Sequence, residues 1–363
     1  MNMREQTGTL VIGGGQAGLA VGRELAERDL PFLIVDANAR TGDSWRNRWD
    51  SLTLFTPNWA NSLPGLQFPG EDWDFPTKDE AADYLELYAR YFELPIRHHT
   101  RVERLTRDGD WFVATAGDTT FVAENVVVAM AAYQRRKVPT LADELDRGIV
   151  QLHASEYRNP GQLQDGPVLV VGAGNSGAEI AMELVENHDV LLSGPSTGAQ
   201  PFRPDRLSGR ILMPFFGKVL LTRILSKSTP IGRRVLPKLF HKGAPLLRVK
   251  PRDLRRAGVV RVGRTVSAEG GQPVLEDGSR HDVANVVWCT GFDHGLSWLD
   301  LPVFDEHGEV EHDRGVVGSQ PGLYFVALKF QHSILSDTLL AVGRDAAHVV
   351  DRIRERSRAA APA

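Results

Sequence analysis

The chain has a single cysteine, Cys289, among its 363 residues. One cysteine cannot form a disulfide within the chain and cannot supply a redox-active Cys-x-x-Cys pair. A disulfide reductase that works through its own cysteine pair is therefore excluded. The sequence also lacks an apolar run of membrane-spanning length and an N-terminal signal pattern, so a reducing cytoplasm is the expected location.

Acidic residues are scarce in one long stretch. Residues 201–264, here called the basic insert, hold 17 Lys and Arg against only Asp205 and Asp253, whereas the whole chain has a net charge of -4. The stretch therefore carries +15 and the remainder -19. A solvated basic face or a rim that attracts anions accounts for this asymmetry, and we expect no nucleic-acid partner.

What the sequence does contain is a glycine-rich fingerprint. Its first copy, Gly13-Gly14-Gly15-Gln16-Ala17-Gly18, follows a strand-like run at 9–12 and opens a helical pattern at 17–28. The first glycine permits a tight turn, the second lets the backbone approach a pyrophosphate, and the third allows helix and strand to pack closely. A second strand at 31–35 ends at Asp36, where an acid accepts hydrogen bonds from ribose. This combination predicts an adenine dinucleotide site.

The second copy reads Gly172-Ala173-Gly174-Asn175-Ser176-Gly177 and lies between a strand at 168–171 and a helix at 175–186. Its next strand, 190–193, ends in Ser193-Gly194-Pro195-Ser196, without the acid that selects NAD. We therefore expect NADPH, bound with help from Ser193 and Arg203, while NADH stays open. Two such sites in one chain indicate hydride transfer from a nicotinamide to a flavin.

The order of these patterns predicts an α/β fold with two Rossmann-like domains, one inserted into the other. We expect the first domain to comprise residues 1–160 and 287–363, and the second, residues 161–286, to contain the basic insert. The crossing is expected at the polar segment 159–167. A final helix over about 336–354, capped by Ser336 and Asp337, should return to the first domain.

The basic insert contains apolar residues at helical spacing, interrupted by Pro214 and Gly217. Such a stripe suits a lid that packs on the protein over a lipophilic substrate channel. The alternative is a helix that makes weak contact with a membrane surface, because interfacial helices also pair an apolar stripe with Lys and Arg. The stripe comprises Ile211, Leu212, Phe215, Phe216, Val219 and Leu220.

Over nearly its whole length the chain resembles the bacterial flavin-containing monooxygenases, which are class B flavoproteins. The resemblance is carried by the two glycine fingerprints, by Gly42-Asp43-Ser44-Trp45-Arg46 and by Trp288-Cys289-Thr290-Gly291-Phe292. It implies FAD at the first site and NAD(P)H at the second, with no metal. The expected flavin-binding residues are Gly13, Gly15, Gln16, Ala17, Gly18, Asp36, Ala37, Gly42, Ser44, Trp45, Val102 and Ala129. The expected nicotinamide-binding and linker residues are Gly172, Gly174, Asn175, Ser176, Gly177, Ser193, Arg203, Thr290 and Gly291.

The resemblance also implies a reaction: reduced flavin adds dioxygen at C4a, and the hydroperoxide oxygenates an amine, a thioether or a ketone of a small lipophilic substrate. Trp45, Phe55 and His153 are the flavin-side candidates. Phe55 stands where animal members carry an asparagine that supports the oxygen adduct, so an NAD(P)H oxidase that releases peroxide is the first alternative. A flavoprotein that senses redox state or docks on membranes without turnover is the second, and a homodimer stays open.

Overall fold

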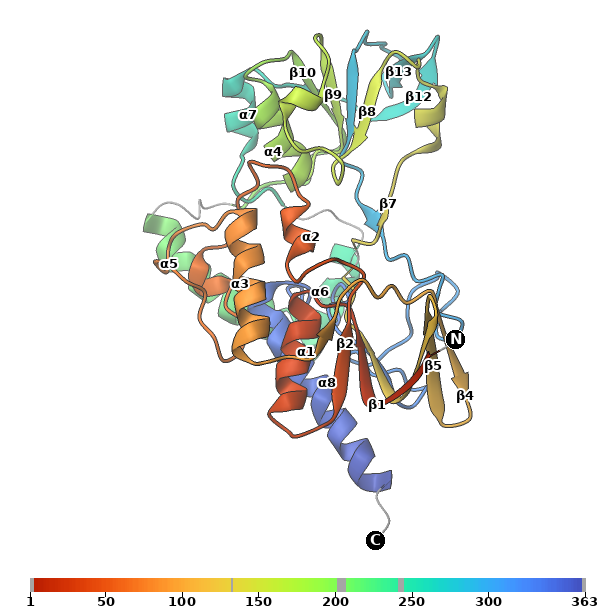
Figure 1. Ribbon diagram of the computed structural model, residues 1–363. Coiled ribbons are helices and arrows are strands. Elements are labelled where there is room, and N and C mark those ends of the chain that lie inside the picture. The colour runs from red at the N-terminus through yellow and green to blue at the C-terminus, as the bar shows by residue number, and fades with distance from the viewer. Residues whose placement is uncertain (1–2, 132, 201–206, 241–244, 361–363) are drawn as a thin grey trace.

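The computed structural model describes residues 3–131, 133–200, 207–240 and 245–360, which form two lobes joined by a narrow connection (Figure 1). The first lobe is built on a seven-stranded sheet in the order β3-β2-β1-β6-β5-β4, with β16 paired to β6. Strands β3, β2, β1, β6 and β16 run parallel, and β5 and β4 add an antiparallel extension. The strands are β1 (Met3–Ile12), β2 (Phe32–Val35), β3 (Ile96–Arg97), β4 (Arg104–Asp108), β5 (Trp111–Ala116), β6 (Thr119–Val128) and β16 (Leu323–Phe325).

Helices cover this sheet. Helix α1 (Gln16–Ala26) packs against α8 (Leu339–Ala360), and α3 (Lys78–Tyr91) lies beside α1. Helix α3 begins at a capping box in which Thr77 accepts from the Glu80 N–H and the Glu80 carboxylate accepts from the Thr77 N–H. Tyr84 and Tyr88 of α3 donate to the carbonyls of Leu66 and Pro64, which anchors the long loop after the short helix α2 (Asp43–Arg46). The loop also contains η1 (Asn58–Ala60).

The second lobe has a five-stranded, fully parallel sheet in the order β11-β10-β9-β14-β8. Its inner strands β9 and β14 are almost continuously apolar and buried, as expected for a parallel sheet covered on both faces. The two parallel sheets confirm the predicted α/β fold with two Rossmann-like domains. The elements are β8 (Val150–His153), β9 (Val168–Val171), α4 (Asn175–Leu184), β10 (Val190–Ser193), α7 (Pro251–Ala257), β11 (Val260–Val262), β14 (Asn285–Trp288), the hairpin β12 (Thr265–Glu269) and β13 (Gln272–Leu275), η2 (Thr140–Glu144) and η3 (Pro160–Gln162).

The chain crosses between the lobes at a two-stranded antiparallel pair, β7 (Arg135–Arg136) and β15 (Phe292–Asp293). Strand β8 already belongs to the second sheet. The outward crossing therefore lies at β7, before the polar segment 159–167 where the sequence places it. The two-residue strands carry no alternating pattern long enough to be recognised in the sequence.

The basic insert contributes α5 (Leu207–Phe215), η4 (Phe216–Ile224) and α6 (Pro230–Phe240). The expected interruption at Pro214 is wrong, because α5 continues directly into η4, which is wound as a π-helix. Proline removes one backbone donor, and a change of winding at such a residue is a known way to continue the chain. None of the described helices has the length and hydropathy needed to span a bilayer.

Candidate functional site

The first glycine turn, between β1 and α1, leaves room on one side only. Gly13 has φ +110°, and a Cβ there would lie 2.9 Å from the carbonyl oxygen of Ala129. A Cβ on Gly18 would lie 1.8 Å from the Gly13 carbonyl oxygen. A Cβ on Gly15, in contrast, meets no protein atom within 4 Å. Gly13 and Gly18 are thus required by the protein itself, whereas the space at Gly15 is left for a ligand.

The second turn, between β9 and α4, repeats this geometry. Gly172 has φ +112°, and its Cβ would lie 2.2 Å from the carbonyl oxygen of Cys289. A Cβ on Gly177 would lie 1.8 Å from the Gly172 carbonyl oxygen, and Gly174 again faces open space. The two turns therefore make the same contacts at the same three positions, and each leaves the same side open.

Each turn also places a helix N-terminus at its open side. Gly15 and Gly174 are the N-caps of α1 and α4, and neither helix has a side-chain cap on its first N–H groups. Uncapped N–H groups at the positive end of a helix bind phosphate oxygens. The residues present therefore fit a pyrophosphate at both turns.

Asp36 lies at the carboxyl end of β2, beside the first turn. One carboxylate oxygen accepts from the Gly14 N–H, and the other accepts from the Asn38 N–H at 2.7 Å. The side chain is buried, and Ala37 beside it is exposed. Asp36 thus fixes the glycine turn against the end of β2, and lies where the fold brings a ribose.

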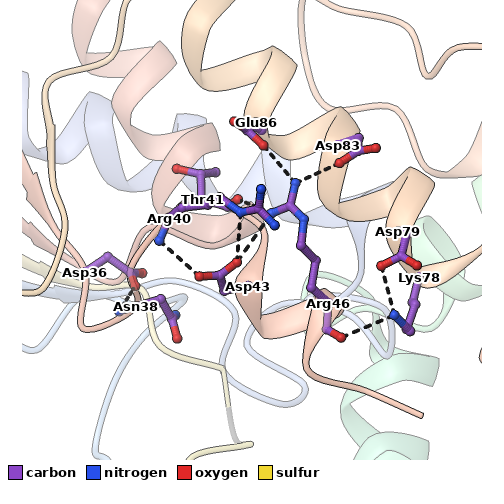
Figure 2. A network of polar contacts seen from close by, with 10 residues as sticks. All are labelled: Asp36, Asn38, Arg40, Thr41, Asp43, Arg46, Lys78, Asp79, Asp83 and Glu86. Atoms are coloured by element: carbon purple, nitrogen blue, oxygen red, sulfur yellow. Dashed lines mark hydrogen bonds and ion pairs between the residues drawn. The ribbon is translucent and has the colours of Figure 1, made fainter. Parts of the chain in front are cut away.

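The segment after Asp36 is held to α3 by one arginine (Figure 2). Arg46 pairs with Asp83 at 2.7 Å and Glu86 at 2.8 Å, and it donates to the Thr41 carbonyl at 2.7 Å. The guanidinium is mostly covered, so these charge-assisted bonds are strong ones. They fix α2 and its preceding turn relative to α3.

Two predicted flavin-side residues lie on this fixed segment. Ser44 is exposed, and Trp45 is half-buried against the core of the first lobe. Gly42 before them has φ +91°, and a Cβ there would lie 2.5 Å from the Ala82 carbonyl oxygen. Gly42 is therefore needed for close packing of α2 on α3.

Other predicted flavin-site residues fall in different surroundings. Val102 and Ala129 are buried, Ala17 is buried in α1, and Phe55 is 38% exposed on the loop after α2. The Gln16 side chain donates to the Asp337 carbonyl at 3.0 Å, which joins the start of α1 to the segment before α8. The structure therefore brings the start of α1 and the segment before α8 together, and leaves Phe55 at the surface.

His153 is inside the second lobe, with 1% of its surface exposed. Its Nε2 lies 3.0 Å from the Gly291 carbonyl oxygen, so Nε2 donates, and Nδ1 accepts from the Ser155 N–H at 3.2 Å. Burial lowers the pKa of this imidazole, which keeps it neutral. Both ring nitrogens are engaged, so His153 ties β8 to the return linker. Thr290 in the same linker donates to the Lys137 carbonyl.

At the second site the predicted polar residues divide. Ser176 is exposed at the start of α4. The Asn175 side chain accepts from the Leu247 N–H at 2.9 Å and donates to the Pro245 carbonyl at 3.2 Å, so it holds the end of the basic insert. Ser193 is fully buried and donates to the Gly263 carbonyl at 2.8 Å. The structure does not bring Ser193 to the open side of the turn, and Arg203 lies outside the described residues.

Arg261 is a residue that the sequence interpretation missed. It lies on β11, next to β10, and its guanidinium donates to the Gly194 carbonyl at 2.7 Å. It is therefore a cation at the tip of the second strand, where the sequence shows none. Strand β11 was hidden inside the basic insert, but the alternation Val260-Arg261-Val262 was the available signal.

Helices α5, η4 and α6 of the basic insert lie against the first lobe, whereas α7 and β11 of the same insert belong to the second (Figure 1). The Arg210 guanidinium lies 5.8 Å from the ring centre of Trp73, and Arg344 of α8 donates to the Thr222 carbonyl at 2.9 Å. Two residues of the apolar stripe face solvent: Ile211 is 68% exposed and Leu212 is 40% exposed. The expectation that the stripe packs on the protein is therefore wrong for these two residues.

Arg248, near the end of the insert, joins the two lobes. Its Nη1 donates to the Thr53 carbonyl of the first lobe at 3.1 Å, and its Nε lies 3.8 Å from the Glu179 carboxylate of α4. Burial raises the pKa of Glu179 to about 7, against a smaller opposing effect of Arg248. Glu179 also escaped the sequence interpretation, because nothing in its local pattern distinguishes it from a surface helix residue.

Comparison with known proteins places this chain among the flavin-dependent oxidoreductases. The family model described as pyridine nucleotide-disulphide oxidoreductase matches residues 10–211. The oxidoreductase CzcO-like of Geobacillus kaustophilus is 41% identical, over 97% of this chain and 99% of that protein. The probable indole-3-pyruvate monooxygenase YUCCA7 of Arabidopsis thaliana is 28% identical, over 86% of this chain and 78% of that one. Among solved structures, the flavin-containing monooxygenase from Stenotrophomonas maltophilia has a TM-score of 0.77 at 25% identity, over 97% of this chain and 99% of that chain.

The raised pKa of Glu179 predicts a pH-dependent cost to folding. The folded state holds this proton more tightly than the unfolded chain, so the cost appears as pH rises above the ordinary glutamate range and is complete above pH about 7. Glu179→Gln should therefore raise the free energy of unfolding at pH 8 by as much as about 3 kcal/mol, at roughly 1.4 kcal/mol per pKa unit, and change little at pH 4. Denaturant unfolding at both pH values measures this, with the exposed Glu186→Gln as control. An equal gain at both pH values would contradict it.

Proposed function

Because the chain belongs to the pyridine nucleotide-disulphide oxidoreductase family, as a flavin-dependent oxidoreductase, we propose that it is an FAD-dependent, NADPH-using monooxygenase of a small organic substrate. The observation that carries this proposal is the pair of matching glycine turns, each with open space at one glycine and an uncapped helix N-terminus beside it. When bound, FAD and NADPH would supply hydride transfer and the activation of dioxygen. The chain's own residues bind and orient the two cofactors.

The first turn is proposed to hold FAD. Asp36 at the end of β2 is placed to accept hydrogen bonds from a ribose, and the Arg46 network fixes Gly42, Ser44 and Trp45 nearby. The solved relative from Stenotrophomonas is a flavin-containing monooxygenase that shares the fold over 97% of this chain and 99% of its own. This likeness supports the same cofactor at the first turn here.

The second turn is proposed to hold NADPH. No acid stands at the end of β10 to repel a 2'-phosphate, and Arg261 supplies a positive charge beside Gly194. Burial lowers the pKa of Arg261, yet a guanidinium stays charged at neutral pH, so an approaching phosphate would find a partly desolvated cation. This arrangement favours NADPH over NADH.

The basic insert is proposed to act as a lid. Its contacts to Trp73 and Arg344, and the link from Arg248 to Thr53 and Glu179, place it against both lobes. A lid at this position would keep water from the meeting point of the two cofactors. A weak contact with a membrane surface is a secondary proposal, supported by the exposed side chains of Ile211 and Phe215.

The competing function is an NAD(P)H oxidase that releases hydrogen peroxide. Assay of oxygenated product against peroxide, with the thioethers 4-(methylthio)benzoate and thioanisole as probe substrates, separates the two. The proposal predicts that sulfoxide from the better thioether accounts for most of the NADPH consumed. Peroxide equal to the NADPH consumed, with no oxygenated product from either thioether or from a matched amine, would favour the oxidase.

The two open glycines predict separable losses of the two cofactors. A methyl group at Gly15 or Gly174 meets no protein atom, so both alanine variants should fold and only the ligand is obstructed. We expect Gly15→Ala to purify with little flavin. Gly174→Ala should stay yellow, with the KM for NADPH raised roughly tenfold or more, which corresponds to about 1.4 kcal/mol.

Flavin content and NADPH kinetics measure these losses. Gly318→Ala is the control, since its methyl group also meets open space. Gly172→Ala is not a suitable variant, because its Cβ would lie 2.2 Å from the Cys289 carbonyl oxygen. Equal loss of flavin in Gly15→Ala and Gly174→Ala would show that the two sites are assigned wrongly.

Arg261→Gln should weaken the binding of NADPH more than the binding of NADH. Charge-assisted hydrogen bonds contribute roughly 1.5–3 kcal/mol, so we expect a ten- to hundredfold rise in the KM for NADPH. The KM for NADH should change little, and the exposed Arg256→Gln on α7 serves as the charge control. A rise of equal size for both nicotinamides would mean that Arg261 only supports the loop at Gly194.

A further inference from the structure

A cavity of about 1000 Å³ lies outside the two glycine turns, between the basic insert and the segment that follows β16. Its walls include the apolar side chains of Leu296, Val310, Leu328 and Phe330. The volume is at the upper end of the range for pockets that bind small molecules, and an apolar lining with a few polar groups is typical of them.

The cavity begins where the first sheet ends. Leu328 and Phe330 follow β16, whose Phe325 is paired with Val128 at the end of β6. Ala129, the residue after β6, lies against Gly13 of the first glycine turn. The cavity and the first turn therefore lie at the same carboxyl end of the parallel strands, which is where a substrate must lie to reach a cofactor bound there.

Cations dominate the polar part of the lining. Lys227 and Arg233 come from the basic insert, and Lys329 follows β16. Across the ranges that the structure describes, none of these three makes an ion pair within 4 Å. Of the two acids in the lining, Glu309 lies 3.9 Å from His294. Burial lowers the pKa of Lys227, and the nearby carboxylates of Asp313 and Asp345 oppose that effect. Arg233 donates to the Lys227 carbonyl at 3.4 Å, so its guanidinium lies close to Lys227. The three cations outnumber the two acids of the lining, and this excess of positive charge beside apolar walls favours a negatively charged ligand.

The segment next to Lys227 contains buried polar atoms that lack hydrogen-bond partners within the described residues. The Lys227 N–H donates to the His332 carbonyl at 2.8 Å, and Ser226 bridges Ser333. His332 is only 5% exposed, and within the described part of the chain its Nδ1 and the Ser333 hydroxyl have no hydrogen-bond partner. Burial lowers the pKa of His332 to about 4, so it is neutral and adds a polar atom rather than a charge. The expected cap role of Ser336 is wrong, because its hydroxyl accepts from the His332 and Ser333 N–H groups and α8 begins only at Leu339.

We propose that this cavity binds the substrate and selects organic carboxylates, with the apolar body against Phe330 and Leu296 and the carboxylate on Lys227 and Lys329. The inference rests on the proposed function, since it names the substrate class of that reaction. The inference also narrows the range of expected substrates, because a neutral or cationic amine of the same shape would leave Lys227 and Lys329 without a negative partner. The lid contributes Lys227, so the lid takes part in recognition as well as in excluding water.

Calorimetric binding to the oxidised, FAD-loaded protein tests this without turnover. The probes are 4-(methylthio)benzoate and the uncharged 4-(methylthio)benzamide, which have nearly the same shape. The proposal predicts that the benzoate binds at least about tenfold more tightly, a difference of about 1.4 kcal/mol. Lys227→Met should remove that preference and leave benzamide binding unchanged, because methionine keeps the backbone N–H that holds His332. Lys227→Arg should restore most of it.

The matched control is Arg255→Met on α7, which removes one exposed charge from the other lobe and should change neither affinity. Equal affinities for the two probes, equal losses of both in Lys227→Met, or no binding of either would overturn the inference. Failure of the proposed function is distinguishable. A protein that binds the benzoate through Lys227 but never oxygenates contradicts only the function, and one that oxygenates the benzamide equally well contradicts only the carboxylate selection.

Discussion

The structure depends on the close approach of a helix to the carbonyl oxygen of a glycine turn. At both sites the third glycine of the fingerprint would place a Cβ 1.8 Å from the carbonyl oxygen of the first glycine, so no other residue can stand there. That approach fixes each helix N-terminus at the carboxyl edge of a parallel sheet. The open glycine between them, Gly15 or Gly174, leaves space for a ligand beside the uncapped helix N-terminus. The same geometry, made twice, supports two dinucleotides in one chain.

The basic insert connects these two sites physically. It belongs by chain order to the second lobe but contacts the first, through Arg210, Thr222 and Arg248. Three of its cations have distinct positions. Arg248 lies between the lobes near Glu179, Lys227 lines the cation-rich cavity, and Arg261 lies at the end of β10. The resemblance to flavin-containing monooxygenases is confirmed, and the insert is where this chain offers its own chemistry.

The two Rossmann-like units could be predicted because their signals are local: Gly13 to Asp36 and Gly172 to Ser193 are each a contiguous strand, turn and helix. Arg261 and Glu179 could not, because their roles arise from pairing between β10 and β11 and from a contact across the lobes. The predicted crossing at 159–167 was misplaced, because the strands at the observed crossing, β7 and β15, have two residues each and carry no periodic pattern. The exposed Ile211 and Leu212 show that apolar spacing identifies a helix face without showing what covers it.

Hydride transfer requires that one chain hold a flavin and a nicotinamide in contact. Anaerobic titration of the purified protein with NADPH, followed by flavin absorbance, tests this most directly. We expect a yellow protein that is bleached by one equivalent of NADPH per flavin, and more slowly by NADH. A protein that purifies without flavin and binds none, or whose flavin stays oxidised with both nicotinamides, would contradict it.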